Sequence, residues 1–294
     1  MLDDATLVRL RRLAVALKRM PGTILLLEHI RTYFARDMRT VTVNDFDGTL
    51  TVDLCLGEHM QSQIFWYGYY SRDIILAMNK LLRPGMVVFD VGANIGEISM
   101  AAAQRVGATG RVFAFEPMPA LHQKLMFNLS RNGMSQVDPV RKGLSDKAGV
   151  APIYFAESSF SDGTKHEGLG TLYPSEQRAS LAGEIEITTL DSFFAEAQPS
   201  RLDLVKIDVE GAELDVLRGG ERTLARFRPH LILEAQNETA QSGGHEAKNI
   251  LQFLEPLGYA FFTIGRKARL RPLQSDDLAA FQNVLCVPTQ PGTQ

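Results

Sequence analysis

Short apolar runs that end at polar residues recur along the chain and predict the strands of one sheet. Residues 87–90 form such a run, which is typical of a parallel strand buried on both faces. Six further segments have a strand pattern: residues 111–115, 137–142, 202–207, 230–236, 259–264 and 284–287. Helical patterns at 97–106, 119–132, 212–217 and 247–257 separate several of these runs. The alternation predicts a doubly wound, mostly parallel seven-stranded α/β sheet.

The first part of the chain has a different pattern. Residues 5–20 place Leu7, Leu13 and Ala14 on one helical face, and a second helix is expected at 23–36. Residues 40–44 and 49–56 alternate around Asp47-Gly48, which predicts a β-hairpin. We therefore expect an N-terminal helical extension at 1–39, a main domain at 40–288 and a tail at 289–294.

The first helix is also basic, and its apolar face permits three interpretations. It could pack on its own domain, on a second copy in a homodimer, or on an anionic membrane surface, and the first two uses are the commoner ones. The aromatic cluster at 65–70 has two interpretations, a core plug or one wall of an acceptor pocket. Ser71 then fits the N-cap of a helix at 72–82.

Residues 149–190 interrupt the β–α alternation. Two short strands are expected there, at 151–156 and 184–190, with a polar glycine-containing loop between them. Because the segment would lie at the ligand-binding edge of the sheet, we expect an inserted lid or acceptor-selecting region.

A glycine-containing loop follows the strand at 87–90. Gly92 and Gly96 permit backbone angles and close ligand approach that a Cβ would block, and Asn94 tolerates a positive φ. Glu116 comes 20 positions after Gly96, at the end of the next strand, where a carboxylate can accept hydrogen bonds from a ribose diol. These features predict a nucleoside-containing cofactor.

The loop also separates cofactor classes. The dinucleotide pattern G-x-G-x-x-G needs a glycine where this chain has Asn94. Asp90 precedes the loop, and a carboxylate there suits the ammonium of S-adenosylmethionine (SAM). The pattern therefore favours SAM over a dinucleotide.

Two more carboxylates, Asp208 and Glu210, follow the strand at 202–207. At the end of a parallel strand they could deprotonate an acceptor hydroxyl, hold a divalent cation, or cap the following helix. Glu234 and Asn237 follow the next strand. The acceptor-hydroxyl hypothesis gives Asp208 and Glu210 a catalytic role, with Asp208 also close to the cofactor.

The composition narrows the possible classes of function but does not identify a substrate. The 294 residues carry a net charge of −3, which gives no electrostatic argument for nucleic acid. Cys55 and Cys286 are expected to be small core residues of a protein from a reducing compartment. No apolar run approaches the roughly 20 residues of a membrane span. We expect a cytoplasmic protein without stable membrane insertion.

Four sequence blocks together resemble the FkbM family of SAM-dependent methyltransferases. They are VFDVGANIGEIS at 88–99, FAFEPMPAL at 113–121, GLSDKAG at 143–149 and LDLVKIDVEGAELDVLRGG at 202–220. The similarity covers roughly residues 50–260. It implies a class I SAM-dependent, Rossmann-like methyltransferase domain, with Leu144 against the adenine and Ser145 or Asp146 hydrogen-bonded to it.

The resemblance favours O-methylation of a hydroxyl on a sugar, glycan or polyketide-like secondary metabolite. An N- or protein methyltransferase and a non-catalytic SAM-binding scaffold remain alternatives, and a dinucleotide-dependent oxidoreductase is a weaker third. In metal-dependent catechol-type O-methyltransferases of this fold class, Asp208, Glu234 and Asn237 have rough counterparts. Their spacing leaves a Mg²⁺ requirement open.

Overall fold

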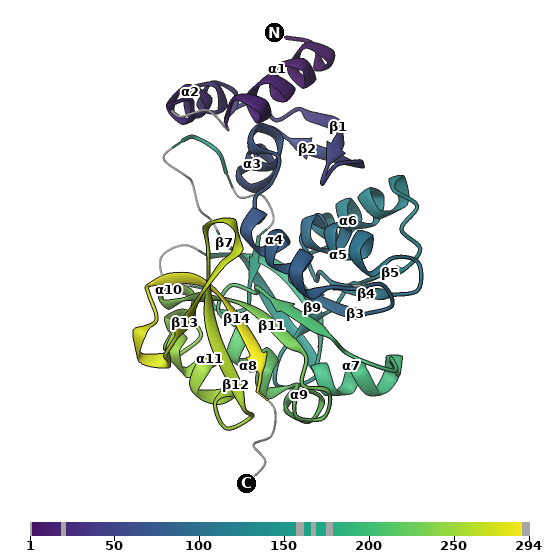
Figure 1. Ribbon diagram of the computed structural model, residues 1–294, viewed down its shortest axis with the longest axis vertical. Helices are drawn as coiled ribbons and strands as arrows, with labels where there is room; N and C mark the ends of the chain where they lie inside the picture. The colour runs from purple at the N-terminus through teal and green to yellow at the C-terminus, as the bar shows by residue number, and fades with distance from the viewer. Residues whose placement is uncertain (1, 19–21, 157–161, 166–168, 175–178, 290–294) are drawn as a thin grey trace.

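The computed structural model describes residues 2–18, 22–156, 162–165, 169–174 and 179–289. A sheet of eight strands forms its centre, in the order β13-β12-β14-β11-β10-β3-β4-β5 (Figure 1). The strands are β3 (Val87–Val91), β4 (Arg111–Phe115), β5 (Val137–Val140), β10 (Leu204–Ile207), β11 (His230–Gln236), β12 (Tyr259–Gly265), β13 (Arg269–Leu273) and β14 (Phe281–Pro288). The five strands from β5 to β11 are parallel, whereas β14 is antiparallel to both of its neighbours. The predicted doubly wound, mostly parallel sheet is therefore confirmed.

The predicted number of seven strands is wrong by one. The segment 266–271, which lies between the strands predicted at 259–264 and 284–287, contains the 3₁₀ turn η1 (Arg266–Ala268) and the start of β13. Strand β13 pairs antiparallel with β12 at the edge of the sheet. Four of its five residues are exposed, so the alternation that marks a half-buried strand is missing.

Helices cover both faces of the sheet because the central strands are apolar on both sides. In β3, Val88 packs into one core cluster while Val87, Phe89 and Val91 pack into the other. The first face carries α4 (Arg72–Leu81), α5 (Glu97–Val106) and α6 (Pro119–Arg131). The second carries α7 (Leu190–Ala197), α8 (Glu213–Arg218), α9 (Glu221–Phe227) and α11 (Ala247–Leu254). The short α10 (Asn237–Ser242) follows β11, and η2 (Ser275–Asp277) precedes β14.

The N-terminal elements form a cap at one pole of the molecule, opposite the C-terminal end of the chain (Figure 1). They are α1 (Asp4–Leu17), α2 (Ile24–Phe34), β1 (Thr40–Phe46), β2 (Leu50–Cys55) and α3 (His59–Tyr67). The two helices and the hairpin were predicted, and α3 was not. Strands β1 and β2 form a separate two-stranded sheet.

Helix α1 packs on its own chain. Leu7 and Ala14 are buried as predicted, but Leu13 is 55% exposed, so its assignment to the buried face is wrong. Arg11 takes part in that face instead, 1% exposed, with its Nη1 2.6 Å from Asp45 Oδ2 on β1. An ion pair therefore joins α1 to the hairpin.

The inserted region forms a second, four-stranded sheet. Its order is β6-β9-β7-β8, with β6 (Gly143–Leu144), β7 (Gly149–Ala156), β8 (Gly170–Thr171) and β9 (Ala179–Thr188). The two strands predicted here exist and are longer than expected, and part of the intervening loop lies outside the described residues. Residues 143–146, expected as a turn, begin with a strand because Gly143 and Leu144 pair with β9.

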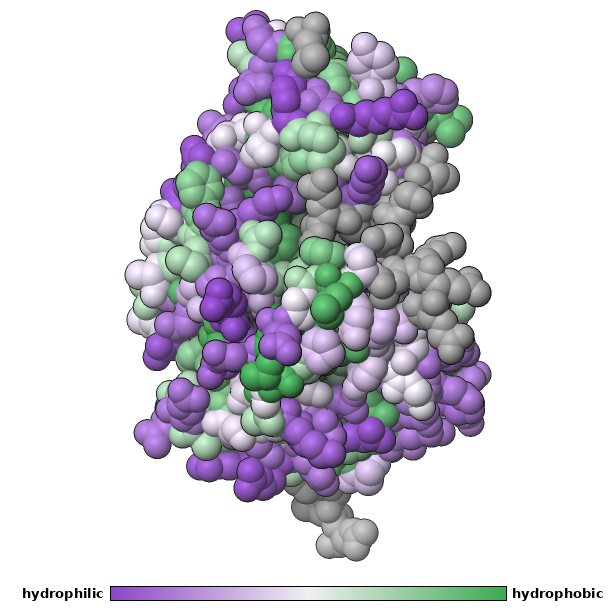
Figure 2. Space-filling model, turned by 180° about the vertical axis from the view of Figure 1, so that it is seen from behind, coloured by the Kyte–Doolittle hydropathy of each residue, from purple (hydrophilic) through white to green (hydrophobic). Residues whose placement is uncertain are grey.

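Cys55 and Cys286 are buried, as expected of core residues. Of the tail, Thr289 is hydrogen-bonded to Gly258, and residues 290–294 lie outside the described part of the chain. Among the described residues, no helix has the length and apolar character needed to cross a membrane. The face in Figure 2 carries small, separate hydrophobic patches among polar residues.

Candidate active site

A cavity opens at the carboxyl ends of β3, β4, β10 and β11, with residues of the inserted sheet and of the N-terminal cap completing its wall. The glycine loop contributes Gly92, Asn94 and the neighbouring Glu97. Parallel strands bring their carboxyl ends to one edge, which is why segments far apart in sequence meet here. Strands β10 and β11 contribute Lys206 and Glu234. From the other loops and the second sheet come Glu116, Met118, Lys142, Leu144, Ile153, Leu169, Gly170, Leu172, Ile185, Asp208 and Glu210.

The glycine loop has the backbone conformation that the sequence predicted. Gly92, Asn94 and Gly96 all have a positive φ, of 80°, 51° and 96°. The space that the two glycines leave, however, is filled by the protein itself. A Cβ on Gly92 would lie 1.9 Å from the Asp208 carbonyl oxygen, and one on Gly96 would lie 2.7 Å from Leu125 Cδ1. Glycine is required here by packing between the loop, the end of β10 and α6.

Glu116 lies at the end of β4 and points back to this loop. Its carboxylate accepts hydrogen bonds from the backbone N–H groups of Asn94, at 2.8 Å, and Met118, at 2.9 Å. The side chain also lines the cavity, so a carboxylate oxygen can accept further hydrogen bonds from a ligand diol. Burial raises the pKa of Glu116 to about 7.

Asp90 lies behind the cavity wall. It is fully buried, accepts a hydrogen bond from the Ser99 hydroxyl at 2.5 Å, and has its Oδ1 3.6 Å from Lys206 Nζ. This placement corrects the expectation that its carboxylate meets a cofactor ammonium directly. Asp90 instead fixes the first turn of α5 and the Lys206 side chain.

Lys206 was missed in the sequence. It is a buried lysine on β10 whose Nζ donates to the Gly92 carbonyl oxygen at 3.0 Å and lies 3.3 Å from Asp208 Oδ2. Although burial opposes the charged form, the carboxylates of Asp208 and Asp90 raise the pKa of this ammonium. The sequence does contain a sign of the contact with Asp208. Lys206 lies within an apolar strand two residues before Asp208, and residues two apart in a strand face the same side of the sheet.

Three carboxylates gather beside Lys206. Asp208, Glu210 and Glu234 each place one oxygen within 4.8 Å of the others. Burial, followed by the charge of Asp208, raises the pKa of both Glu210 and Glu234, so the cluster retains protons that exposed carboxyls would lose. Glu210 has a left-handed φ of 55°, and its carbonyl oxygen accepts a hydrogen bond from Thr171 Oγ1 at 2.9 Å.

Glu213 is a further residue that sequence reasoning missed. Its carboxylate accepts from the backbone N–H groups of Val209, at 3.0 Å, and Gly211, at 3.1 Å. It therefore holds the turn that precedes α8. That helix has no side-chain hydrogen bond at its N-cap, so the capping role that was an alternative for Asp208 and Glu210 is not seen. Their carboxylates line the cavity instead.

Of the predicted metal ligands Asp208, Glu234 and Asn237, only the first two lie together. Glu234 lies in the cluster with Asp208, whereas the Asn237 side chain accepts a hydrogen bond from the backbone N–H of Ala247 at 3.3 Å. Asn237 therefore joins the starts of α10 and α11. The carboxylates available to a cation are those of Asp208, Glu210 and Glu234.

At the expected nucleoside end, Leu144 lines the cavity. Ser145 is buried but is not among the lining residues, and its backbone N–H donates to the Thr188 carbonyl oxygen at 3.1 Å. The neighbouring Asp146 is exposed. An adenine contact from Leu144 remains the better supported of these predictions.

The aromatic cluster at 65–70 contains both core residues and a residue of the cavity wall, so each of the two interpretations holds for part of it. Phe65 and Trp66 are fully buried in α3, where Trp66 stacks on Phe34 of α2 with ring centroids 5.4 Å apart. Tyr70 lines the cavity, and burial followed by the negative charges of Asp208 and Glu234 raises the pKa of its phenol. The first residues plug the core, while Tyr70 faces the carboxylates.

The chain matches known proteins over this region. The Methyltransferase FkbM domain model matches residues 90–261. The AMB antimetabolite synthetase AmbE of Pseudomonas aeruginosa is 32% identical over 69% of the chain and 10% of its own length. The 31-O-demethyl-FK506 methyltransferase FkbM of Streptomyces tacrolimicus is 36% identical over 48% of the chain and 61% of its own length. The hexuronic acid methyltransferase AglP of Haloferax volcanii is 31% identical over 51% and 56%. The chain thus spans less than two thirds of the length of each of these relatives.

Proposed function

We propose that this chain, which belongs to the FkbM methyltransferase family, transfers the methyl group of SAM to a hydroxyl of a sugar, glycan or polyketide-like metabolite. The observation that supports this most strongly is the composition of one cavity. Glu116 and the glycine loop line the same space as Asp208, Glu210 and Glu234. A nucleoside-binding carboxylate and a proton-accepting cluster are thereby placed within reach of one ligand pair.

The residues fit SAM on structural grounds. Glu116 keeps acceptor capacity toward the cavity, and Leu144 offers an apolar surface for a base. The positive charge of a sulfonium is compatible with a wall that carries several carboxyl groups. When bound, SAM would supply a methyl group that is already electrophilic.

The protein's own contribution would then be orientation and proton transfer. An alcohol becomes a good nucleophile only as its proton leaves, and a positioned carboxylate accelerates such a step by roughly 10²–10⁴-fold. We assign this role to Asp208, with Glu210 as its neighbour in the cluster. SAM would supply the methyl group to the acceptor oxygen and would leave as S-adenosylhomocysteine (SAH), while Asp208 would accept the proton that the hydroxyl loses.

Lys206 supports this assignment. Its ammonium lies 3.3 Å from Asp208 Oδ2, so the lysine can hold this carboxylate in one orientation within the cavity. Glu210 and Glu234 have raised pKa values and hold protons more readily. Of the three carboxyl groups, Asp208 is therefore the one to which we assign the acceptor proton.

The acceptor class rests on the relatives. FkbM is named for 31-O-demethyl-FK506 and AglP for a hexuronic acid. An O-demethyl compound and a hexuronic acid both carry hydroxyl groups, which agrees with a site that contains a base. We therefore place a hydroxylated sugar or polyketide-like molecule next to Asp208.

The same carboxylates provide a second candidate role, as ligands of Mg²⁺. Three carboxylate oxygens within 4.8 Å of one another suit a hard cation, although the Lys206 ammonium already supplies positive charge beside them. A metal-dependent reaction would stop in EDTA and recover with MgCl₂. A reaction that depends only on the base would be unchanged by either.

The test is methyl transfer from radiolabelled SAM to a panel of p-nitrophenyl hexosides and hexuronides. Asp208→Asn should lower turnover by about 100-fold or more, since the amide cannot accept the proton. Its affinity for SAH should stay within about threefold, because Glu116 and the glycine loop are untouched. Calorimetry gives that affinity.

Asp138→Asn is the matched control, because Asp138 forms an exposed ion pair with Arg111 on the strands β4 and β5. It should behave as the wild type in both assays. An Asp208→Asn protein that binds SAH normally and turns over at the wild-type rate would remove the base assignment.

A further inference from the structure

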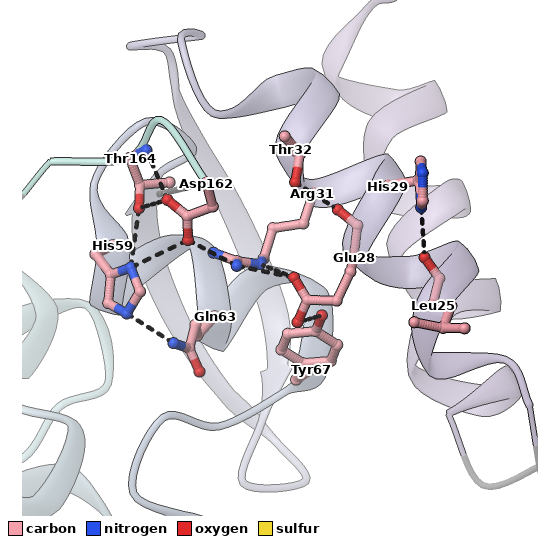
Figure 3. A network of polar contacts seen from close by, with 10 residues as sticks. All are labelled: Leu25, Glu28, His29, Arg31, Thr32, His59, Gln63, Tyr67, Asp162 and Thr164. Carbon is pink, nitrogen blue, oxygen red and sulfur yellow. Dashed lines mark hydrogen bonds and ion pairs between the residues drawn. The ribbon is translucent and has the colours of Figure 1, made fainter. Parts of the chain in front are cut away.

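A buried polar network joins the N-terminal cap to the inserted region (Figure 3). Asp162 is at its centre. One carboxylate oxygen lies 2.7 Å from Arg31 of α2 and 3.5 Å from Nδ1 of His59 on α3. The other accepts from the backbone N–H of Thr164 at 2.8 Å, and the Thr164 hydroxyl lies 2.9 Å from the same His59 nitrogen. One carboxylate thus connects three segments that are far apart in sequence.

Backbone contacts reinforce this junction. The N–H of His59 donates to the Lys165 carbonyl oxygen at 2.9 Å, and the N–H of Lys165 donates to the Gly57 carbonyl oxygen at 3.1 Å. The inserted segment therefore pairs with the residues that begin α3. Its position is defined by the cap as well as by its own sheet.

Arg31 is held in this network by contacts on both sides of its guanidinium. It is 6% exposed, and on its other side its guanidinium contacts Glu28, whose second oxygen accepts from the Tyr67 hydroxyl at 2.6 Å. Burial opposes ionisation of Asp162, but hydrogen bonds from Thr164 and Arg31 lower its pKa. A buried charge whose partner is removed is strongly unfavourable, so the contact is an effective constraint on both segments.

The two segments joined by Asp162 both contribute to the cavity wall. The cap supplies Met60 from α3 and Tyr70 just after it. The inserted region supplies Leu169, Gly170 and Leu172, which begin four residues after Lys165.

The inserted segment also reaches the carboxylate cluster directly. Thr171 lies between the lining residues Gly170 and Leu172, and its hydroxyl donates to the carbonyl oxygen of Glu210. On the cap side, the His59 ring packs edge-on to the Tyr70 ring, with centroids 6.3 Å apart. Both sides of the junction therefore contact residues beside Asp208.

We propose that Asp162 is a positioning residue for acceptor binding: it fastens the wall segment at 169–172 to the N-terminal cap and so holds that wall over the carboxylate cluster. The role in acceptor binding rests on the proposed function, whereas the fastening rests on the geometry alone. The N-terminal cap lies outside the matched family region, yet through Asp162 it shapes the acceptor end of the site.

The experiment compares the full-length wild type with Asp162→Asn, which keeps the shape of the side chain and removes its charge. Hydrogen–deuterium exchange of residues 169–173 should be at least about fivefold faster in the variant, with residues 92–96 unchanged. For the best p-nitrophenyl glycoside of the acceptor panel, KM should rise at least about fivefold with kcat within about twofold. SAH affinity should change by less than the acceptor KM.

Two further variants distinguish a local effect at Asp162 from a general loss of structure. Thr164→Val removes a hydroxyl that contacts Asp162 and His59 without leaving a buried charge, and should shift exchange in the same direction by a smaller factor. Arg31→Lys keeps the positive charge and should retain exchange within about twofold of wild type. Asp138→Asn, at an exposed ion pair, should change nothing.

The outcomes are distinct. Unchanged exchange at 169–173 in both Asp162→Asn and Thr164→Val would overturn the proposal, as would a loss of SAH affinity greater than the rise in acceptor KM. The exchange measurement needs no acceptor. If wild-type protein bound no SAH, the proposed function would fail while exchange still decided whether Asp162 fastens the wall.

Discussion

At the residue scale, the chemistry of the cavity depends on which carboxyl groups hold a proton. Burial favours the neutral form of Glu116, Glu210 and Glu234, and the Lys206 ammonium opposes this effect for Glu116 and Glu210. Lys206 contacts Asp208 and Asp90 directly. The site therefore combines a carboxylate next to a cation with neighbours that bind protons more readily than exposed carboxyl groups, an arrangement that suits proton transfer.

Glu116→Gln tests this arrangement through the pH dependence of SAH binding. Burial raises the pKa of Glu116 to about 7, and only the ionised form can accept a hydrogen bond from each ribose hydroxyl through either oxygen. Wild-type affinity should therefore rise about tenfold from pH 6 to pH 8, since a charge-assisted hydrogen bond contributes about 1.5–3 kcal/mol. Calorimetric titrations across this range give the slope.

The glutamine variant should bind SAH more weakly at pH 8 and show little dependence on pH. A glutamine variant with the wild-type slope would show that another group controls the titration. The fold should respond in the opposite direction to binding. A raised carboxyl pKa means that stability is lost as pH rises toward about 7, so the variant should lose less stability over that interval.

Single residues differ in how far sequence predicts their placement. Asp208, Glu210 and Glu234 follow parallel strands, and parallel strands end at one edge, so their meeting was predictable. Asp90 was misplaced because a residue within a buried strand can face the layer behind the cavity. Lys206 and Glu213 were missed because their roles depend on partners across the sheet and in the following turn, at Gly92 and Val209.

At the element scale, the glycine loop and the end of β10 pack so closely that they form one unit. Gly92→Ala should disrupt both, because its Cβ would lie 1.9 Å from the Asp208 carbonyl oxygen. Gly107→Ala is the matched control. Gly107 also has a positive φ, of 65°, but a Cβ added there would meet no atom of the described residues within 4 Å.

Both variants should lose roughly 1 kcal/mol to backbone strain. Gly92→Ala should lose clearly more, and with it at least about tenfold in SAH affinity, because the loop must move away from Asp208. Thermal unfolding and calorimetry measure the two effects. Equal losses in the two variants would contradict close packing as the reason for Gly92.

The elements that sequence patterns missed share a physical reason. Helix α3 buries nearly every residue, including Phe65 and Trp66, so it has no polar face to produce a helical period. Strand β13 has the opposite composition and is exposed at the sheet edge. The strands β3 and β4 were predictable because continuous apolar runs between glycines mark a buried parallel strand.

At the scale of the whole molecule, three parts contribute to one cavity: the central sheet, the inserted sheet and the N-terminal cap. Sequence predicted the separate parts from changes in pattern. It did not predict that Arg31, His59 and Asp162 meet, because ion pairs between distant segments leave no periodic signal. The sequence permitted several packing partners for the basic helix α1. The helix packs on its own chain through Leu7 and Ala14.

Binding of SAM through Glu116 and the glycine loop is the step on which the rest of the proposed function depends. Calorimetric titration of the purified chain with SAM, SAH and NAD tests it most directly. We predict dissociation constants on the order of micromolar for SAM and SAH, about −8 kcal/mol, and no measurable binding of NAD. Glu116→Ala should weaken or abolish the first two. Binding of NAD in their place, or no binding of SAM and SAH, would contradict the claim.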